Sequence, residues 1–241
     1  MGRHGTIAGR KAAQDSKRAA VFTKYARAIM VAAKGGGDPA YNATLKNAIE
    51  KDKGINMSKD KIEQAIKKGT GELAGDSLTE ARFEGYGPSG IAVIVDVLTD
   101  NMNRTTSAVK HIFDRFGGNL GSQGSVSYMF ERKGVILIEK GAAEEDDIME
   151  AGLDAGLEDV IDADEYWEIR TATEDLHAVA DALREAGLQI EESDVDFIPN
   201  MESEPKDEHA LKSLSKMIDA FEENDDVQKV YTNCSVPLIF E

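Results

Sequence analysis

The chain has 241 residues, of which 41% are hydrophobic and 30% are charged, and its formal net charge is −17. These values exclude a fibrous, a collagen-like and a wholly disordered protein. No apolar run approaches the ~18 residues that a membrane span needs, so we expect no contact with a membrane. The single cysteine, Cys234, can form no internal disulfide, and no apolar stretch follows the first residues, so we expect a cytoplasmic protein.

The acidic net charge conceals a strong asymmetry along the chain. Residues 1–76 carry a net charge of +7, residues 77–140 are neutral, and residues 141–241 carry −24. Such an arrangement is typical of a basic element that binds a polyanion, joined to an acidic body that repels one.

Residues 1–77 are predicted to form a basic domain of short helices. Its first helix is rich in alanine and lacks proline and glycine, and a run of three glycines with a proline ends it. Ser58 is expected to cap the third helix, and Gly69 is expected to follow its last turn. The three helices are expected over residues 10–34, 41–53 and 59–68.

The pattern changes to alternating strands and helices after residue 80. Two strands flank the turn at residues 87–90, and Asn103 is expected to cap a helix that Gly117 closes. Alternating apolar residues then predict a strand at 126–130. The tail adds one helix and one strand, which are too few to stand alone and are therefore expected to return to an earlier sheet.

Residues 133–200 give the order β-α-β-β-α-β, which is the signature of a ferredoxin-like domain. The expected fold class is therefore α+β.

The cations of the first helix form the main candidate site. At 100° per residue, five of them share one face opposite the apolar stripe, and Lys61 adds a further charge on the third helix. Such a face matches the spacing of phosphates, although a solvated surface is the simpler alternative. The candidate nucleic-acid-binding residues are Arg10, Lys11, Lys17, Arg18, Lys24, Arg27, Lys34, Lys59, Lys67 and Lys68.

No set of residues in the sequence supports catalysis. The G-x-G-x-x-G match at residues 85–90 leads into a strand rather than a helix, and the histidines are scattered. We therefore expect no enzyme, no cofactor and no metal. The polar turn at residues 99–105 has two interpretations, which are helix capping and a loop that faces a partner through Asn101, Asn103 and Arg104.

Several stretches together resemble the YebC/PmpR family, and they run in the same order over about 130 residues. The sequence departs from the family at its start, where Gly2-Arg3-His4-Gly5-Thr6-Ile7 replaces an opening that usually contains an aromatic residue. The stretches that carry the resemblance are Arg10-Lys11-Ala12-Ala13-Gln14-Asp15-Ser16-Lys17-Arg18, Gly36-Gly37-Asp38-Pro39, Asn56-Met57-Ser58-Lys59-Asp60, Glu84-Gly85-Tyr86-Gly87-Pro88, Leu98-Thr99-Asp100-Asn101 and Gly117-Gly118-Asn119-Leu120-Gly121.

The resemblance implies three domains. These are an N-terminal three-helix bundle, a middle α/β domain and a third, ferredoxin-like domain inserted into the middle one. The expected boundaries are 1–77 for the bundle, 78–132 plus 205–241 for the middle domain, and 133–204 for the acidic third domain.

Three functions stay open at this point. The family is described as DNA-binding transcriptional regulators, and also as ribosome-associated translation factors that bind ribosomal RNA and relieve stalling at proline-rich stretches. The third is a protein-interaction adaptor that uses the acidic domain. We predict a non-enzymatic, nucleic-acid-binding regulator of gene expression, with DNA or ribosomal RNA bound by the basic domain and a protein partner possible for the acidic one.

Overall fold

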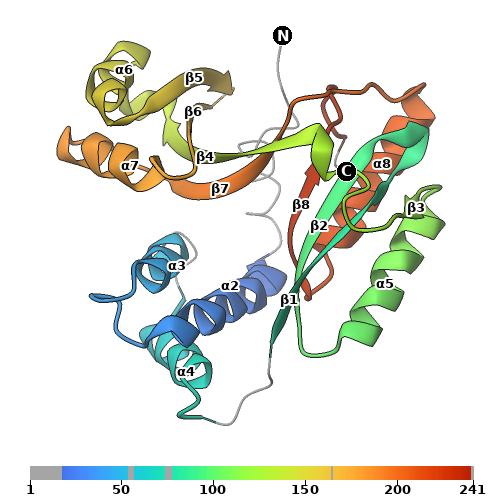
Figure 1. The fold of residues 1–241 in the computed structure, drawn as a ribbon, viewed down its shortest axis with the longest axis horizontal. Helices are drawn as coiled ribbons and strands as arrows, with labels where there is room; N and C mark the ends of the chain where they lie inside the picture. The colour runs from blue at the N-terminus through green and yellow to red at the C-terminus, as the bar shows by residue number, and fades with distance from the viewer. Residues whose placement is uncertain (1–17, 54–56, 74–77, 164, 240–241) are drawn as a thin grey trace.

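A computed structural model describes residues 18–53, 57–73, 78–163 and 165–239 (Figure 1). In these residues three helices precede two four-stranded sheets, and each sheet carries two helices of its own. The α+β fold class predicted from the sequence is confirmed. No helix within the described ranges is long and apolar enough to cross a membrane.

The N-terminal bundle consists of α2 (Arg18–Ala32), α3 (Ala43–Lys53) and α4 (Lys59–Gly69). Its core is formed by Ile29, Leu45 and Ala65, each at most 3% exposed. The sequence suggested that Gly69 follows the last turn of α4, but in the structure Gly69 is the last residue of this helix. A Cβ added there would lie 2.2 Å from the carbonyl oxygen of Met30, so glycine allows α2 and α4 to approach closely.

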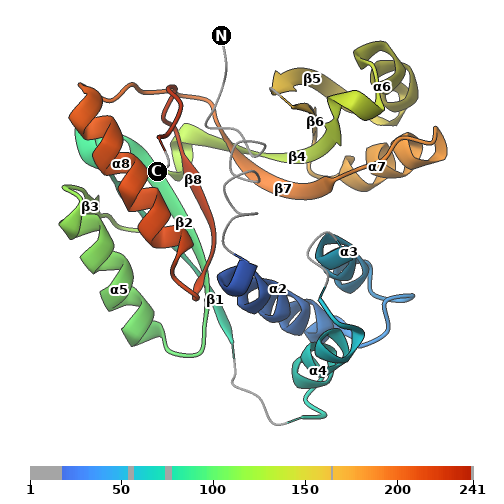
Figure 2. The same ribbon diagram turned by 180° about the vertical axis from the view of Figure 1, so that it is seen from behind.

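The middle sheet has the strand order β3-β1-β2-β8, and its strands are β1 (Thr79–Tyr86), β2 (Ala92–Thr99), β3 (Asn119–Leu120) and β8 (Val227–Thr232). All neighbouring strands are antiparallel. The helices α5 (Met102–Arg115) and α8 (Glu208–Glu222) cover one face of this sheet, as Figure 2 shows. Strand β8 pairs with β2, so the tail returns to the earlier sheet as expected.

The core between this sheet and its helices is apolar and closely packed. The rings of Phe113 on α5 and Phe221 on α8 meet edge to face, with 5.0 Å between their centroids. Both side chains are fully buried together with Val93 and Val95 of β2. Burial of such residues supplies the main free energy that holds the two helices on the sheet.

The second sheet contains the ferredoxin-like order of elements that the sequence predicts. Its strand order is β5-β6-β4-β7, all antiparallel, and α6 and α7 pack on one face through Ile148 and Leu183. The elements are β4 (Phe130–Glu139), α6 (Glu145–Gly152), β5 (Leu157–Ala163), β6 (Tyr166–Thr171), α7 (Leu176–Glu185) and β7 (Glu192–Pro199).

The two sheets meet where β7 lies against β8. Phe197 and Tyr231 pack edge to face with 5.4 Å between ring centroids, and the Tyr231 hydroxyl donates to Asp196 at 2.9 Å. Lys229 donates to Asp194 at 2.6 Å and to Asp196 at 2.7 Å. This junction, which joins the second sheet to the middle one, combines apolar burial with paired charges.

One predicted strand is wrong. Residues 127–129 form a 3₁₀ turn, and β4 begins only at Phe130. The cause is the buried carboxylate of Glu84, which accepts hydrogen bonds from the backbone N–H groups of Gly124, Val126 and Ser127 at 2.8–2.9 Å. These donors turn toward one side chain and are therefore not available to a sheet. Burial raises the pKa of Glu84, but the three backbone bonds lower it more, and the net pKa is below its usual value.

Replacing Glu84 with glutamine is expected to lower the free energy of unfolding by about 2 kcal/mol, because the amide turns an NH₂ group toward backbone donors. Chemical denaturation measures the change. Glu80→Gln on the same strand is the matched control, since Glu80 is exposed, and it is expected to change stability by less than about 0.5 kcal/mol. Equal effects of the two variants would contradict a structural role for the Glu84 carboxylate.

Candidate nucleic-acid interface

The predicted phosphate-binding residues fall into three groups in the structure. Arg10, Lys11 and Lys17 lie outside the described residues, and Arg18 is the first residue of α2. The second group comprises the remaining cations of α2 and the turn after it. The third group lies on α4. The second group contains Lys24, Arg27 and Lys34, and the third group contains Lys59, Lys67 and Lys68.

The cations of the second group contact the middle part of the molecule. Lys24 is only 8% exposed, and its Nζ donates to the carbonyl oxygen of Glu222 at 2.6 Å. The Nζ of Lys34 donates to the carbonyl oxygen of Leu78 at 2.8 Å. Lys24 is therefore buried against the middle part of the molecule, and its role in phosphate binding stays a prediction.

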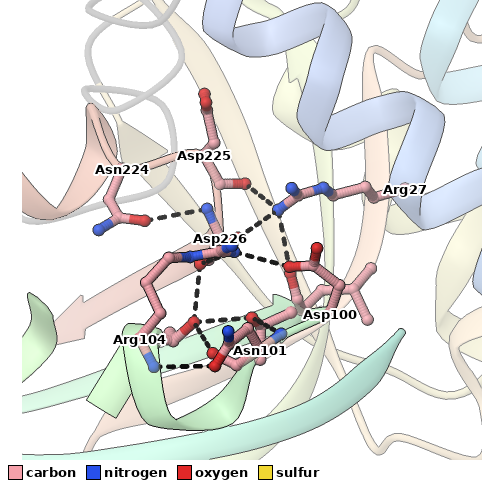
Figure 3. A network of polar contacts seen from close by, with 10 residues as sticks. Arg27, Asp100, Asn101, Arg104, Asn224, Asp225 and Asp226 are labelled. Carbon is pink, nitrogen blue, oxygen red and sulfur yellow. Dashed lines mark hydrogen bonds and ion pairs between the residues drawn. The ribbon is translucent and has the colours of Figure 1, made fainter. Parts of the chain in front are cut away.

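Arg27 makes the most extensive of these contacts. Its Nη1 donates to Asp226 Oδ1 at 2.7 Å and to the carbonyl oxygens of Asp225 at 2.7 Å and Leu98 at 3.1 Å (Figure 3). The guanidinium of α2 thus reaches the end of β2 and the turn between α8 and β8. It ties the N-terminal bundle to the middle sheet.

Asp226 accepts from several sides at once. Its Oδ2 receives hydrogen bonds from Arg104 at 2.9 Å and from the Thr105 hydroxyl at 2.7 Å, while its Oδ1 receives a hydrogen bond from Arg27. Burial raises the pKa of Asp226, but the bonds from Thr105, Arg104 and Arg27 lower it more, so the net pKa lies below its usual value. We refer to Arg27, Arg104, Thr105 and Asp226 as the interdomain clasp.

The polar turn at residues 99–105 is explained by capping and by the clasp. Asn101, not Asn103, is the N-cap of α5, and its side-chain oxygen accepts from the backbone N–H of Arg104 at 3.1 Å. The Arg104 side chain also pairs with Asp100 at 2.7 Å. Asn101, Asn103 and Arg104 stay exposed in part, and contact with a partner remains a prediction.

Replacing Asn101 with alanine is expected to lower the free energy of unfolding by about 1 kcal/mol, because the N–H of Arg104 loses its capping partner. Thermal unfolding measures this loss. Asn103→Ala is the matched control, since α5 places Asn103 inside its first turn and exposed, and little change is expected. A larger loss for Asn103→Ala would contradict this assignment of the cap.

The lysines of α4 are arranged differently from those of α2. Lys59, Lys61, Lys67 and Lys68 are all exposed, and none forms an ion pair with any described residue. Lys61 lies over the ring of Phe22, 5.2 Å from its centroid. Lys61 and Lys68 lie on one side of α4, and Lys59 and Lys67 lie on the other. Together these exposed lysines are the candidate phosphate-binding groups, which we call the α4 lysine surface.

Lys61 was identified from the sequence as a further cation of α4 but was not included among the candidate phosphate contacts. The sequence contained a signal for this residue, because Lys61 and Lys68 are seven residues apart and so lie on one side of a helix.

No group of three or more His, Cys, Asp or Glu residues that could hold a metal ion occurs in the described part of the chain.

The structure defines a class of protein: a helical bundle that contacts a middle antiparallel sheet, which is joined in turn to a second, ferredoxin-like sheet. The family of TACO1/YebC N-terminal domains matches residues 3–72, and that of TACO1/YebC second and third domains matches residues 78–234. The chain belongs to the YebC/PmpR family.

Similar proteins from other organisms agree with this membership. A probable transcriptional regulatory protein of Persephonella marina is 52% identical over 229 residues, covering 94% of this chain and 92% of the relative. One of Clostridioides difficile is 49% identical and covers 98% of this chain and 100% of the relative. The crystal structure of a conserved hypothetical protein from Aquifex aeolicus is 42% identical, with a TM-score of 0.86 and 92% of each chain covered.

Proposed function

We propose that this protein is a non-enzymatic regulator of gene expression that binds nucleic acid through its N-terminal bundle. The observation that carries the proposal is the α4 lysine surface, where four exposed ammonium groups lie on one short helix without ion-pair partners among the described residues. Lysines that neutralise the phosphates of a nucleic acid release the cations condensed on it, and this release favours binding. The names of the relatives, which are probable transcriptional regulatory proteins, support a role in transcription.

The charge distribution supports the same proposal. Residues 1–76 carry a net charge of +7, while residues 141–241 carry −24 and are expected to repel polyanions. A nucleic acid is therefore expected to approach the bundle from the side away from the acidic sheet.

A ribosome-associated translation factor is the second candidate. The exposed cations of α4 are lysines, which contact phosphates as point charges, whereas base readout in the major groove commonly uses arginine, asparagine and glutamine. Contact with phosphate but not with base edges suits a structured RNA as well as a DNA duplex.

The proposal is tested by fluorescence anisotropy with a duplex DNA and a structured ribosomal RNA fragment of equal length, between 50 and 200 mM salt. Binding is expected to weaken steeply, with a slope near −0.9 per phosphate contacted for duplex DNA. Tighter binding of the DNA supports the transcriptional role, and tighter binding of the RNA supports the translational one. Absence of binding to both, or binding insensitive to salt, would contradict the proposal and favour an adaptor.

A further inference from the structure

A cavity of about 410 Å³ lies where the N-terminal bundle meets the middle sheet. Residues of α2 and α4 form two of its walls, and Leu78, just before β1, and Asp100, just after β2, form the third. Its volume falls in the range of about 300–1,000 Å³ that is usual for small-ligand sites. The cavity borders the α4 lysine surface, because Lys61 and Lys68 line both.

The walls of this cavity differ in chemistry. One part is apolar, and the half-buried ring of Phe22 belongs to it. Another part carries the ammonium groups of Lys61 and Lys68, both exposed. These walls suit a ligand that combines an apolar body with a negative charge. The other apolar lining residues are Ala26, Met30, Met57, Ala65 and Leu78.

We propose that the cavity holds one unpaired nucleotide of the bound nucleic acid, and this proposal rests on the proposed function. The base would displace the ammonium group of Lys61, which lies 5.2 Å from the centroid of the Phe22 ring, and would lie against that ring and the methionine side chains beside it. The neighbouring phosphates would contact Lys61 and Lys68. Aromatic rings that stack bases beside cations that hold the backbone are the usual elements of single-strand recognition. A base inside an intact duplex cannot reach such a cavity, since its faces are covered by neighbouring base pairs.

Asp100 adds a preference among bases. Its carboxylate is 32% exposed and pairs with Arg104 through Oδ1 at 2.7 Å. Carboxylates accept hydrogen bonds from the amino groups of bases. A base with an amino group is therefore favoured over uracil or thymine.

The test compares an uninterrupted duplex with the same duplex carrying one bulged cytidine, each made as DNA and as RNA. The wild-type protein is expected to bind the bulged form at least about 5-fold more tightly, because one base stacks on an aromatic ring. The arm that shows the larger gain identifies the source of the nucleotide. Phe22→Leu keeps an apolar side chain but removes the ring, and it is expected to abolish the gain. The control is Tyr41→Leu, which removes a 92% exposed ring outside the cavity and should keep the gain.

A second measurement does not depend on a folded variant. Cytidine monophosphate added to the wild-type protein is expected to shift the methyl NMR signals of Met30 and Met57, which line the cavity, and not that of the exposed Met201. Equal binding of bulged and uninterrupted duplexes, or a gain that Phe22→Leu retains, would overturn the nucleotide site, as would absent shifts at Met30 and Met57. Salt-sensitive binding of the uninterrupted duplex would then leave the proposed function standing, whereas loss of all binding would remove both.

Discussion

Replacing Asp226 with alanine is expected to lower the free energy of unfolding by about 3 kcal/mol. The Asp226 side chain is 7% exposed and accepts from two arginines and a threonine hydroxyl, so its removal leaves the partly buried guanidinium of Arg27 without a counter-charge. Denaturant titration monitored by circular dichroism measures the loss. Because Arg27 comes from α2, the bundle is also expected to become more accessible to proteases.

The neighbouring Asp225 supplies the control for this prediction. Its side chain is exposed, and only its backbone carbonyl accepts from Arg27, so Asp225→Ala is expected to change stability by less than about 0.5 kcal/mol. The pH dependence gives a further check. The pKa of Asp226 is lowered in the folded protein, so its contribution is present above the unfolded value of about 3.9 and is lost as the pH falls through the folded value. The stability difference between wild type and Asp226→Asn should shrink in that acidic range, and a constant difference would contradict the assignment.

Replacing all four lysines of the α4 lysine surface with glutamine is expected to weaken nucleic-acid binding on the order of 100-fold at 0.1 M salt, because up to four phosphates are no longer neutralised. The slope of log affinity against log salt should become shallower by about 0.9 for each phosphate of duplex DNA that the variant no longer binds. These side chains are exposed, so thermal unfolding should change little.

The matched control changes the same net charge elsewhere. Lys110 of α5, Lys206 before α8, and Lys212 and Lys216 of α8 are exposed lysines outside the bundle, and all four are replaced with glutamine. The control is expected to bind almost as tightly as wild type. If both quadruple variants lose affinity equally, only net charge matters and the α4 lysine surface is not the site.

Most of the fold could be predicted from local patterns. Hydrophobic periodicity and turn residues indicated the bundle helices, the central hairpin and the β-α-β-β-α-β order, because each depends on residues close together in the chain. The strand expected at residues 126–130 failed for a physical reason. Its alternating apolar residues fit a strand. However, the carboxylate of Glu84, some 40 positions earlier, accepts the backbone N–H groups of Val126 and Ser127 instead.

The candidate site shows the same limit more sharply. A helical wheel correctly groups Lys24 and Arg27 on one side of α2, but it does not show what that side contacts. Their partners Glu222 and Asp226 lie 198 and 199 positions away. A cationic helix face therefore predicts a binding surface equally well for phosphate and for carboxylates and carbonyl groups of the same chain. Only the three-dimensional arrangement separates Lys24 and Arg27, which are engaged by the middle part, from the exposed lysines of α4.

The most direct test of nucleic-acid binding through α4 is ultraviolet crosslinking in cells, with wild-type protein and the α4 quadruple lysine variant compared at equal expression. RNA and DNA that co-purify are both sequenced. We predict that wild type recovers nucleic acid from discrete sites, at promoters for a transcriptional regulator or in one region of ribosomal RNA for a translation factor, and that the variant recovers only background. Equal recovery by both proteins, or background alone from wild type, would contradict the account.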